Sequence, residues 1–348
     1  MARALRIELA WGWHHVMSRG HRGGALFRSD AERRCFLGLV ADLPERYRVE
    51  VHAFVLMDNH YHLLLRTPEA NLSHAVRWLN LSYGIKFNWV HRAHGAVFQG
   101  RFRSVVIEDV PGVVEVARYL HLNPVRVDGL GLGKEDQRRA RVLGCADPGR
   151  ELVQRRLQRL AGYAWSSWRV YGGGEPKPDW LETGVIGKGC GGRTWAEQRK
   201  ALRAFTEEPI RQGRMESPWE QVVGGLVLGD PGFARRVLAG ASVNAEEQTQ
   251  ARRLRPRVRW AEVVRAAEEV RGSRWSTWAD VRGDWGRDAA MYVAVRHGGL
   301  RLAEVVKDVG GLKYQAAAQA VKRFGAALEA DPERQRFVAA LRRRLAIV

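Results

Sequence analysis

Two histidines separated by one residue, His60 and His62, are the side chains with the clearest potential for chemistry. They begin the segment HYHLLLRT (60–67), whose composition predicts a strand. Side chains alternate between the faces of a strand, so both imidazoles should point the same way, about 7 Å apart along it. Such a pair can bind one metal ion. For the bare motif, two ordinary histidines on a polar sheet face are the simpler explanation, and both interpretations stay open.

A tyrosine that could act as a nucleophile follows on a later element. We expect a helix from Pro111 to Leu122, which carries Tyr119, with Asn123 four residues further on. A tyrosine hydroxyl that attacks phosphorus forms a phosphotyrosine link, and an asparagine oxygen is a hard ligand for Mg²⁺ or Mn²⁺. The alternatives are a core tyrosine and a helix C-cap. Because a residue before proline disfavours α geometry, Pro124 leaves the alignment of these two side chains open.

The elements that must position these side chains form a compact α+β unit over residues 11–130. Apolar alternation predicts the strands, and Ser29-Asp30 is a typical helix cap. The order of the elements predicts a ferredoxin-like or RRM-like antiparallel sheet with helices on one face. We expect strands at 11–18, 48–58, 60–67 and 98–109, a turn at Asp58-Asn59, and helices at 29–46, 72–91 and 111–122.

The composition favours a polyanionic partner. Lys and Arg number 57 against 38 Asp and Glu, a net charge of +19, and neutralising nucleic-acid phosphates releases condensed counterions. The cysteines Cys35, Cys145 and Cys190 are too far apart for a zinc ribbon or a disulfide framework. The N-terminus lacks the apolar stretch of a signal peptide, and no segment has enough consecutive apolar residues to span a membrane. We therefore expect a cytoplasmic, nucleoid-associated protein with no membrane partner.

Composition also suggests how the chain is divided. A first domain is expected at 1–174, with an Arg- and Gln-rich insert at about 131–162. The Pro- and Gly-rich stretch 175–193 is typical of a linker. A helical middle region is expected at 194–250, in which Trp219 lies and in which we find no chemistry. A helical DNA-binding region is expected at 251–348, and the C-terminal region as a whole should be all-α.

Four stretches of the sequence, in this order, resemble the REP-associated tyrosine transposases of the HUH single-strand endonuclease and transposase superfamily. They are MDNHYHLLLRTPE, FQGRFRS, ARYLHLNPVRVDGL and YAWSSWRVY, and the resemblance covers roughly residues 11–170. It implies that His60 and His62 bind a divalent metal, Mg²⁺ or Mn²⁺. It also implies that Tyr119 is the nucleophile and that Asn123 completes the metal shell.

The same resemblance implies an activity. Members of the family cleave single-stranded DNA near hairpins, which forms a 5′-phosphotyrosine and leaves a free 3′-OH, and those associated with REP sequences are expected to act as monomers. Two features depart from the family pattern. Asp58 replaces the usual proline before Asn-His, and the insert at 131–162 is longer than the usual connection.

Several basic side chains are candidates for DNA contacts. Arg101 and Arg103 alternate with Phe98 and Phe102, which suits a groove where bases stack and arginines follow phosphates. An exposed strand face is the alternative. Arg126, just after the helix of Tyr119, is a further candidate for a phosphate contact.

The C-terminal region contains a second candidate for DNA binding. Residues about 287–325 resemble the helix-turn-helix of bacterial replication initiators, which would bind duplex DNA. LRLAEVVKDVG (300–310) would be the supporting helix, Gly310-Gly311 the turn and YQAAAQAVKRF (314–324) the recognition helix. A generic helical hairpin is the alternative. The residues expected on the exposed face are Gln315, Gln319 and Lys322.

The leading hypothesis is a transposase-type, metal-dependent endonuclease and strand transferase for single-stranded DNA. One alternative is a domesticated DNA-binding regulator that has lost catalysis. A rolling-circle-type replication initiator is another, although such proteins often carry two tyrosines on one helix and 111–122 offers only Tyr119.

Overall fold

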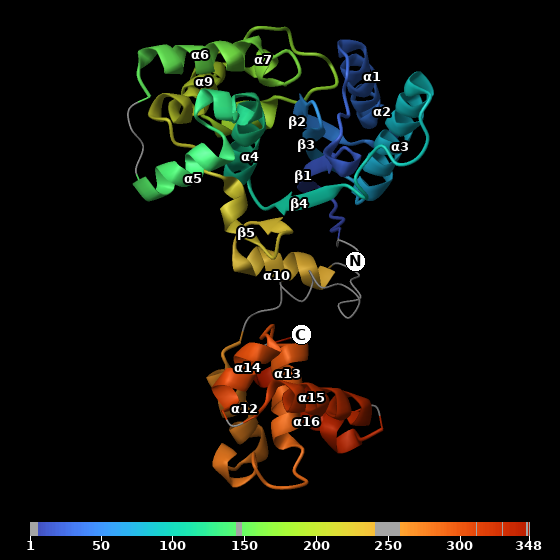
Figure 1. Ribbon diagram of the computed structural model, residues 1–348, viewed down its shortest axis with the longest axis vertical. Coiled ribbons are helices and arrows are strands. Elements are labelled where there is room, and N and C mark those ends of the chain that lie inside the picture. Colours follow the sequence, from blue (N-terminus) through green and yellow to red (C-terminus); the bar gives the residue numbers. More distant parts are fainter. Residues whose placement is uncertain are drawn as a thin grey trace. The chain divides into compact units, whose positions relative to one another are not determined.

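The computed structural model of the chain describes residues 6–143, 148–240, 258–310, 312–328, 330–345 and 347. The molecule divides into two compact units near residue 241, and each is described by itself (Figure 1). Among the described residues, no helix has the length and apolar character needed to cross a membrane.

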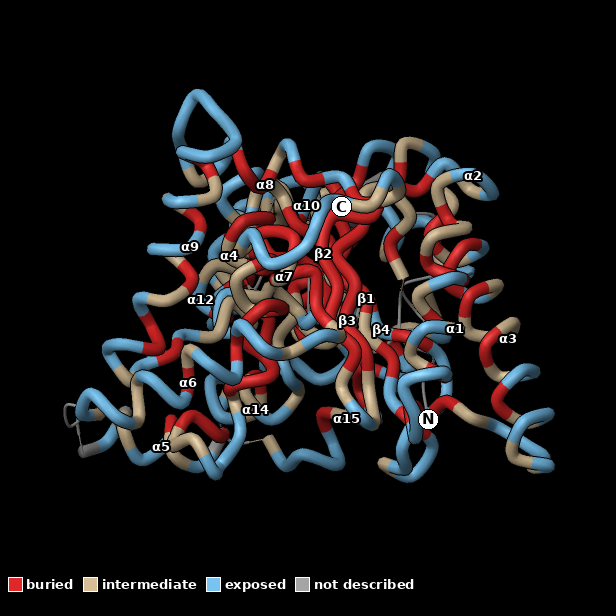
Figure 2. Tube along the Cα trace, turned by 90° about the horizontal axis from the view of Figure 1, so that it is seen from above, coloured by how far each residue is buried: buried red, intermediate tan, exposed pale blue. Residues whose placement is uncertain are grey.

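A six-stranded sheet forms the centre of the first unit. Its order is β2-β3-β1-β4-β6-β5, and the four longer strands pair antiparallel, as the sequence predicts. β6 pairs with β4 in parallel, and neither it nor β5 was expected. Figure 2 shows that β1, β2 and β3 are largely buried, which matches their apolar composition. The strands are β1 Gly12–Arg19, β2 Glu50–Met57, β3 His60–Thr67, β4 Arg103–Ile107, β5 Val222–Val223 and β6 Val227–Leu228.

Helices cover both faces of this sheet. Tyr61 and its neighbours pack against α1 (Asp30–Ala41) and α3 (Leu72–His91), with α2 (Leu43–Tyr47) beside them. Leu64 faces the other way and packs with α4 (Val110–Leu122). The α+β fold is therefore confirmed, but the expectation of helices on one face is incomplete. The reason is that α4 carries its own apolar stripe, which needs a sheet face to cover it.

Local sequence signals explain most element boundaries. The Ser29 hydroxyl accepts a hydrogen bond from the Glu32 N–H at 3.3 Å and caps α1. The single helix expected at 29–46 is divided near Asp42, just before Pro44. The strand expected at 98–109 is shorter, because Gly100 has a left-handed φ of 72° and takes the chain out of the sheet.

The segment YAWSSWRVY extends the sheet beyond its β2 edge. The Leu56 N–H donates to the Trp165 carbonyl at 2.8 Å, and the Ser167 N–H donates to the Phe54 carbonyl at 3.0 Å. The Ser167 hydroxyl also lies 2.9 Å from Nε2 of the buried His121 on α4. This serine therefore connects the helix of Tyr119 to the edge of the sheet.

Replacing Ser167 by alanine should lower the free energy of unfolding of the first unit by about 1–3 kcal/mol, because buried polar groups of His121 and Phe54 lose a partner. Urea denaturation measures the change. Ser82→Ala, at a half-buried position on α3, is the control and should alter stability by less than about 0.5 kcal/mol. Equal stability of the two variants would contradict this role for Ser167.

The expectation of a linker at 175–193 is wrong, because this stretch packs within the first unit and does not separate two domains. Leu181 and Ile186 are fully buried. Gly189 lies so close to α4 that an added Cβ would be 2.6 Å from Val114 Cγ2. The glycines thus permit close helix packing. The helices of this part are α5 Lys134–Leu143, α6 Arg150–Gly162, α7 Trp168–Tyr171, α8 Gly184–Gly189, α9 Trp195–Gln212 and α10 Pro231–Gly240.

The second unit is all-helical in its described part, as the sequence predicts. Its core gathers Met291, Val305 and Phe324. Gln315, Gln319 and Lys322 are all exposed on α15, while Gly311 of the expected turn lies outside the described residues. The helices are α12 Trp260–Arg271, α13 Gly286–Arg296, α14 Leu302–Val309, α15 Tyr314–Leu328 and α16 Pro332–Arg344. Single-turn helices in the chain are His21–Gly23, Asn123–Val125, Asp128–Leu130, Pro218–Gln221 and Trp275–Thr277.

Candidate active site

The two histidines of the HYH segment lie together at the start of β3. Their ring centroids are 5.0 Å apart and the ring planes are nearly perpendicular. His62 is buried and His60 is half-buried. Tyr61, between them, points into the core on the α3 side, as strand alternation requires. At this separation both imidazoles can reach one ion.

Helix α4 brings Tyr119 to the same place. The ring centroid of Tyr119 lies 6.0 Å from that of His62, edge to face. The Arg126 guanidinium lies 4.7 Å from the centroid of the Tyr119 ring. The structure therefore gathers a half-buried tyrosine, two histidines and an arginine at one point of the sheet. A nucleophile, candidate metal ligands and a cation are the groups that phosphodiester cleavage needs.

Asn123 remains aligned with the helix despite Pro124. It has αR geometry, with φ −53° and ψ −40°, because the chain continues from α4 into the single turn Asn123–Val125. Its side-chain Nδ2 donates to the Tyr119 carbonyl at 2.9 Å. This bond identifies Nδ2 as the atom at the helix, so Oδ1 is the atom that could bind a cation. Asn123 is also the C-cap of α4, so a purely structural role stays open.

His15 and Asn59 also belong to the site, although the sequence analysis did not select them. His15 Nε2 lies 2.8 Å from His62 Nδ1. Asn59 Oδ1 lies 2.7 Å from His60 Nδ1. Asn59 was assigned only to a turn. His15 was missed because the pairing of β1 with β3 cannot be read from either segment alone.

Trp219, which lies about 100 residues after Tyr119 in the sequence, also contacts this site. Its ring stacks on His15 at 4.3 Å between centroids and meets the Tyr119 ring edge-on at 5.0 Å. The segment around it carries β5 and β6, and its residue types alone indicated no chemistry. Only the added strand β6 beside β4 brings it here, so no local signal could have revealed it.

Burial determines the protonation of the site histidines. Loss of hydration lowers the pKa of His15 to about 3. Burial also lowers the His62 pKa well below its usual value, and the nearby His15, His60 and Arg126 act in the same direction. Both rings are therefore neutral near pH 7. Neutral imidazole has a nitrogen lone pair, which is the form that binds a metal.

The donor atoms of this cluster fit a divalent cation. In the described part of the chain, no three His, Cys, Asp or Glu side chains converge to hold an ion. The candidate set is instead two imidazoles and one amide oxygen, from His60, His62 and Asn123. Imidazole nitrogen suits the transition metals, and amide oxygen suits Mn²⁺ and Mg²⁺.

The two arginines of FQGRFR lie on different faces of the sheet. Arg103 pairs with Met17, which in turn pairs with His62, so these three share one row on the face of the site. Adjacent strands are roughly 4.8 Å apart, which places the Arg103 Cα roughly 10 Å from that of His62. Arg101 lies on the α3 side, where the interleaved strand expected at 98–102 is absent.

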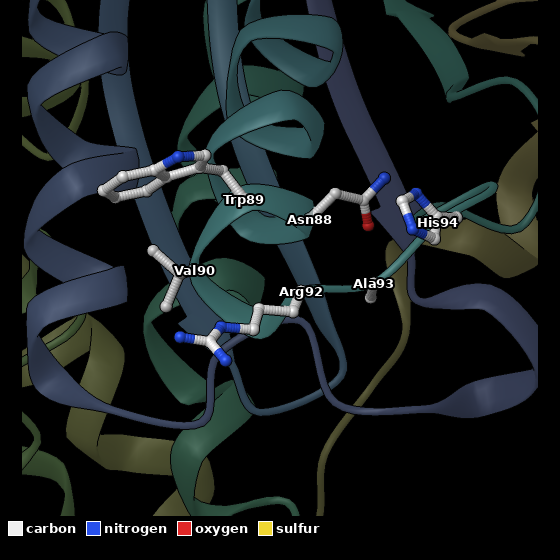
Figure 3. A pocket seen from close by; sticks show the side chains of 6 residues that line it. All are labelled: Asn88, Trp89, Val90, Arg92, Ala93 and His94. Carbon is white, nitrogen blue, oxygen red and sulfur yellow. The ribbon is translucent and has the colours of Figure 1, made fainter.

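A basic groove of about 610 Å³ runs along α3, and its lining includes Arg6, Arg77 and Arg101. Asn80 also lines this groove, and its Oδ1 accepts a hydrogen bond from the Tyr61 hydroxyl, which points into the core. The groove therefore lies on the face of the sheet opposite to Tyr119. A neighbouring pocket of about 750 Å³ is lined by residues 88–90 and 92–94 at the C-terminal end of α3 (Figure 3). Trp89 projects there with 82% of its surface exposed.

Comparison with known proteins gives one family match and a similar solved structure. Residues 12–123, about a third of the chain, match the family model described as "Transposase IS200 like". No curated protein sequence matches the chain significantly. One similar solved structure is a REP-associated tyrosine transposase bound to a REP hairpin. It has 14% identity and a TM-score of 0.36, and the alignment covers 53% of this chain and 93% of that one. The family match spans β1 through Asn123 and so includes every candidate metal ligand and Tyr119. Residues 12–123 are therefore similar to the IS200-like transposases.

Proposed function

We propose that the first unit is a metal-dependent single-strand DNA endonuclease and strand transferase with Tyr119 as its nucleophile. The observation that carries this proposal is the convergence of Tyr119 on α4 with His60 and His62 on β3 and with Arg126, which follows the turn Asn123–Val125. The IS200-like transposase match, which includes His60, His62 and Tyr119, supports it.

In the proposed reaction, the Tyr119 oxygen forms a bond to phosphorus and the bond from phosphorus to the 3′ oxygen breaks. The tyrosine proton ends on the departing oxygen, so the products are a 5′-phosphotyrosine and a free 3′-OH. A 3′-OH from another strand can reverse the step and join the two strands, because the phosphotyrosine conserves the bond. Mg²⁺ or Mn²⁺ held by His60, His62 and Asn123 would stabilise charge on the phosphoryl oxygens.

The substrate we propose is single-stranded DNA that carries a hairpin, as the four family-like motifs suggest. Arg103 lies in the row of His62 and would contact the strand near the scissile phosphate. Arg101 would contact a more distant part of the backbone, together with Arg6 and Arg77 of the groove. The protein is expected to act as a monomer.

The direct test uses a hairpin-bearing single-stranded oligonucleotide and Mn²⁺. We expect a covalent protein–DNA adduct that survives SDS, in which the protein is attached to the 5′-phosphate of the fragment that lies 3′ of the cut. The other fragment should end in a free 3′-OH. Hydrolysis with no adduct would exclude a tyrosine nucleophile. Binding with neither cleavage nor adduct on any hairpin substrate would favour the non-catalytic regulator.

Arg126 should contribute one phosphate contact. We expect Arg126→Ala to weaken oligonucleotide binding and to reduce the slope of log K against log salt by about one, while Arg126→Lys keeps the slope. Fluorescence anisotropy over a salt series measures both. Arg139→Ala, an exposed arginine on α5, is the control. A slope that is the same for Arg126→Ala and the wild type would contradict the contact.

We also propose that α14 and α15 form a helix-turn-helix that binds duplex DNA. The exposure of Gln315, Gln319 and Lys322 on one helix supports this role. Replacing all three by alanine in the full chain should weaken duplex binding at least about tenfold, since a base contact contributes about 1–3 kcal/mol. Cleavage of a short single-stranded oligonucleotide should not change. If the affinity for duplex DNA did not change, α14 and α15 would be a generic helical hairpin and not a DNA-binding helix-turn-helix.

A further inference from the structure

Two side chains outside the candidate metal shell hold the ring nitrogens of its histidines. Asn59 Nδ2 donates to the Gly23 carbonyl at 3.2 Å, which assigns the orientation of the amide. Its Oδ1, 2.7 Å from His60 Nδ1, can then only accept a hydrogen bond. His60 Nδ1 must therefore carry the proton, and Nε2 has the lone pair.

His15 occupies the equivalent position for His62. In the β1–β3 register His15 pairs with Leu64 and Met17 pairs with His62, so the two histidines are diagonal neighbours on one face. Their nitrogens, His15 Nε2 and His62 Nδ1, are 2.8 Å apart, and both side chains are buried. One of the two nitrogens donates and the other accepts.

Trp219 holds His15 in that orientation. Its ring stacks on the His15 ring with an interplanar angle of 26°, and it meets the Tyr119 ring edge-on. The tryptophan belongs to the single turn Pro218–Gln221, far outside the residues matched by the family model. Part of the support for the site therefore comes from the region that follows the matched domain.

We infer that His15 and Asn59 are positioning residues that keep both site histidines in the Nδ1–H tautomer, so that each presents Nε2 to a divalent cation. This inference rests on the proposed function. If His15 accepts from His62, then the His62 lone pair is on Nε2, whereas the opposite bond would place a proton there and block metal binding. His15 itself then carries its proton on Nδ1.

The test measures Mn²⁺ affinity of the full chain by titration calorimetry, independently of cleavage. His15→Leu removes the acceptor and should raise the Kd for Mn²⁺ by about 10- to 100-fold. His15→Gln, whose Oε1 can reach the place of Nε2, should restore most of the affinity. His14→Leu is the matched control, because His14 is buried on the same strand but bonds Thr67 on the opposite face. It should bind Mn²⁺ like the wild type.

A second measurement needs no variant that might misfold. Two-bond ¹H–¹⁵N correlation spectra of the metal-free wild type should show His60 and His62 protonated at Nδ1 and unprotonated at Nε2. A proton on His62 Nε2 would overturn the inference. So would wild-type Mn²⁺ affinity in folded His15→Leu, or equal weakness of the Leu and Gln variants. If the wild type binds no Mn²⁺, the proposed metal site fails as well. Suppose instead that the wild type binds Mn²⁺ and that His62→Gln does not. Wild-type Mn²⁺ affinity in His15→Leu would then contradict only this inference and leave the proposed metal site standing.

Discussion

Replacing Tyr119 by phenylalanine should abolish the covalent protein–DNA adduct and should reduce strand cleavage by at least about 10³-fold. The phenyl ring has no oxygen with which to form the phosphotyrosine. The substitution removes only the hydroxyl oxygen. The half-buried ring still packs between His62, Trp219 and Arg126. Folding and Mn²⁺ affinity should therefore be close to those of the wild type.

The measurement is adduct formation on a labelled hairpin oligonucleotide, resolved on a denaturing gel. Tyr47→Phe is the matched control, since Tyr47 is a half-buried tyrosine that packs on Trp78 at the other side of the sheet. It should form adduct at the wild-type rate. If Tyr119→Phe still forms an adduct, another residue is the nucleophile and the proposed reaction is wrong at its first step.

Replacing His62 by glutamine should lower cleavage by roughly 10³-fold and should weaken Mn²⁺ binding to a similar degree. Removing a ligand from the candidate shell removes several kcal/mol of charge stabilisation on the phosphoryl oxygens. Because His62 also bonds His15, the substitution should lower thermal stability modestly. EDTA should abolish wild-type cleavage but should add little to the defect of the variant.

The control for this prediction is His74→Ala, an exposed histidine on α3. It should keep both Mn²⁺ affinity and cleavage. Calorimetry measures the affinity, and a single-turnover assay over a Mn²⁺ series measures the rate. If high Mn²⁺ concentrations leave His62→Gln inactive while its Mn²⁺ affinity is normal, then His62 acts on the DNA or on Tyr119 and is not a metal ligand.

Local signals in the sequence were sufficient for several parts of this molecule. The Ser29 cap, the β2–β3 hairpin with its Asp58-Asn59 turn, and the helix 72–91 depend on interactions between residues close in the chain. Strand alternation separated Tyr61 from the histidines on either side of it. The +19 charge and the ordered motifs pointed to a DNA-directed enzyme, and residues 12–123 match the IS200-like transposase model.

Other conclusions required the tertiary structure, because they depend on which distant segments meet. A stretch rich in glycine and proline has the composition of a linker, yet Gly189 permits a close helix contact and Ile186 is buried. Arg101 and Arg103 look equivalent in sequence. The register of β4 on β1 places Arg103 in the row of His62, whereas Arg101 precedes the strand and lies on the α3 side.

The sequence by itself determined the candidate chemistry, which comprises the histidine pair, the tyrosine and the asparagine. The tertiary structure decided what surrounds them. His15 reaches His62 through strand pairing across 47 positions of the chain, and Trp219 reaches Tyr119 through a strand added about 100 residues later. Strand register and sheet order arise from the packing of the whole core, so no segment read alone contains them.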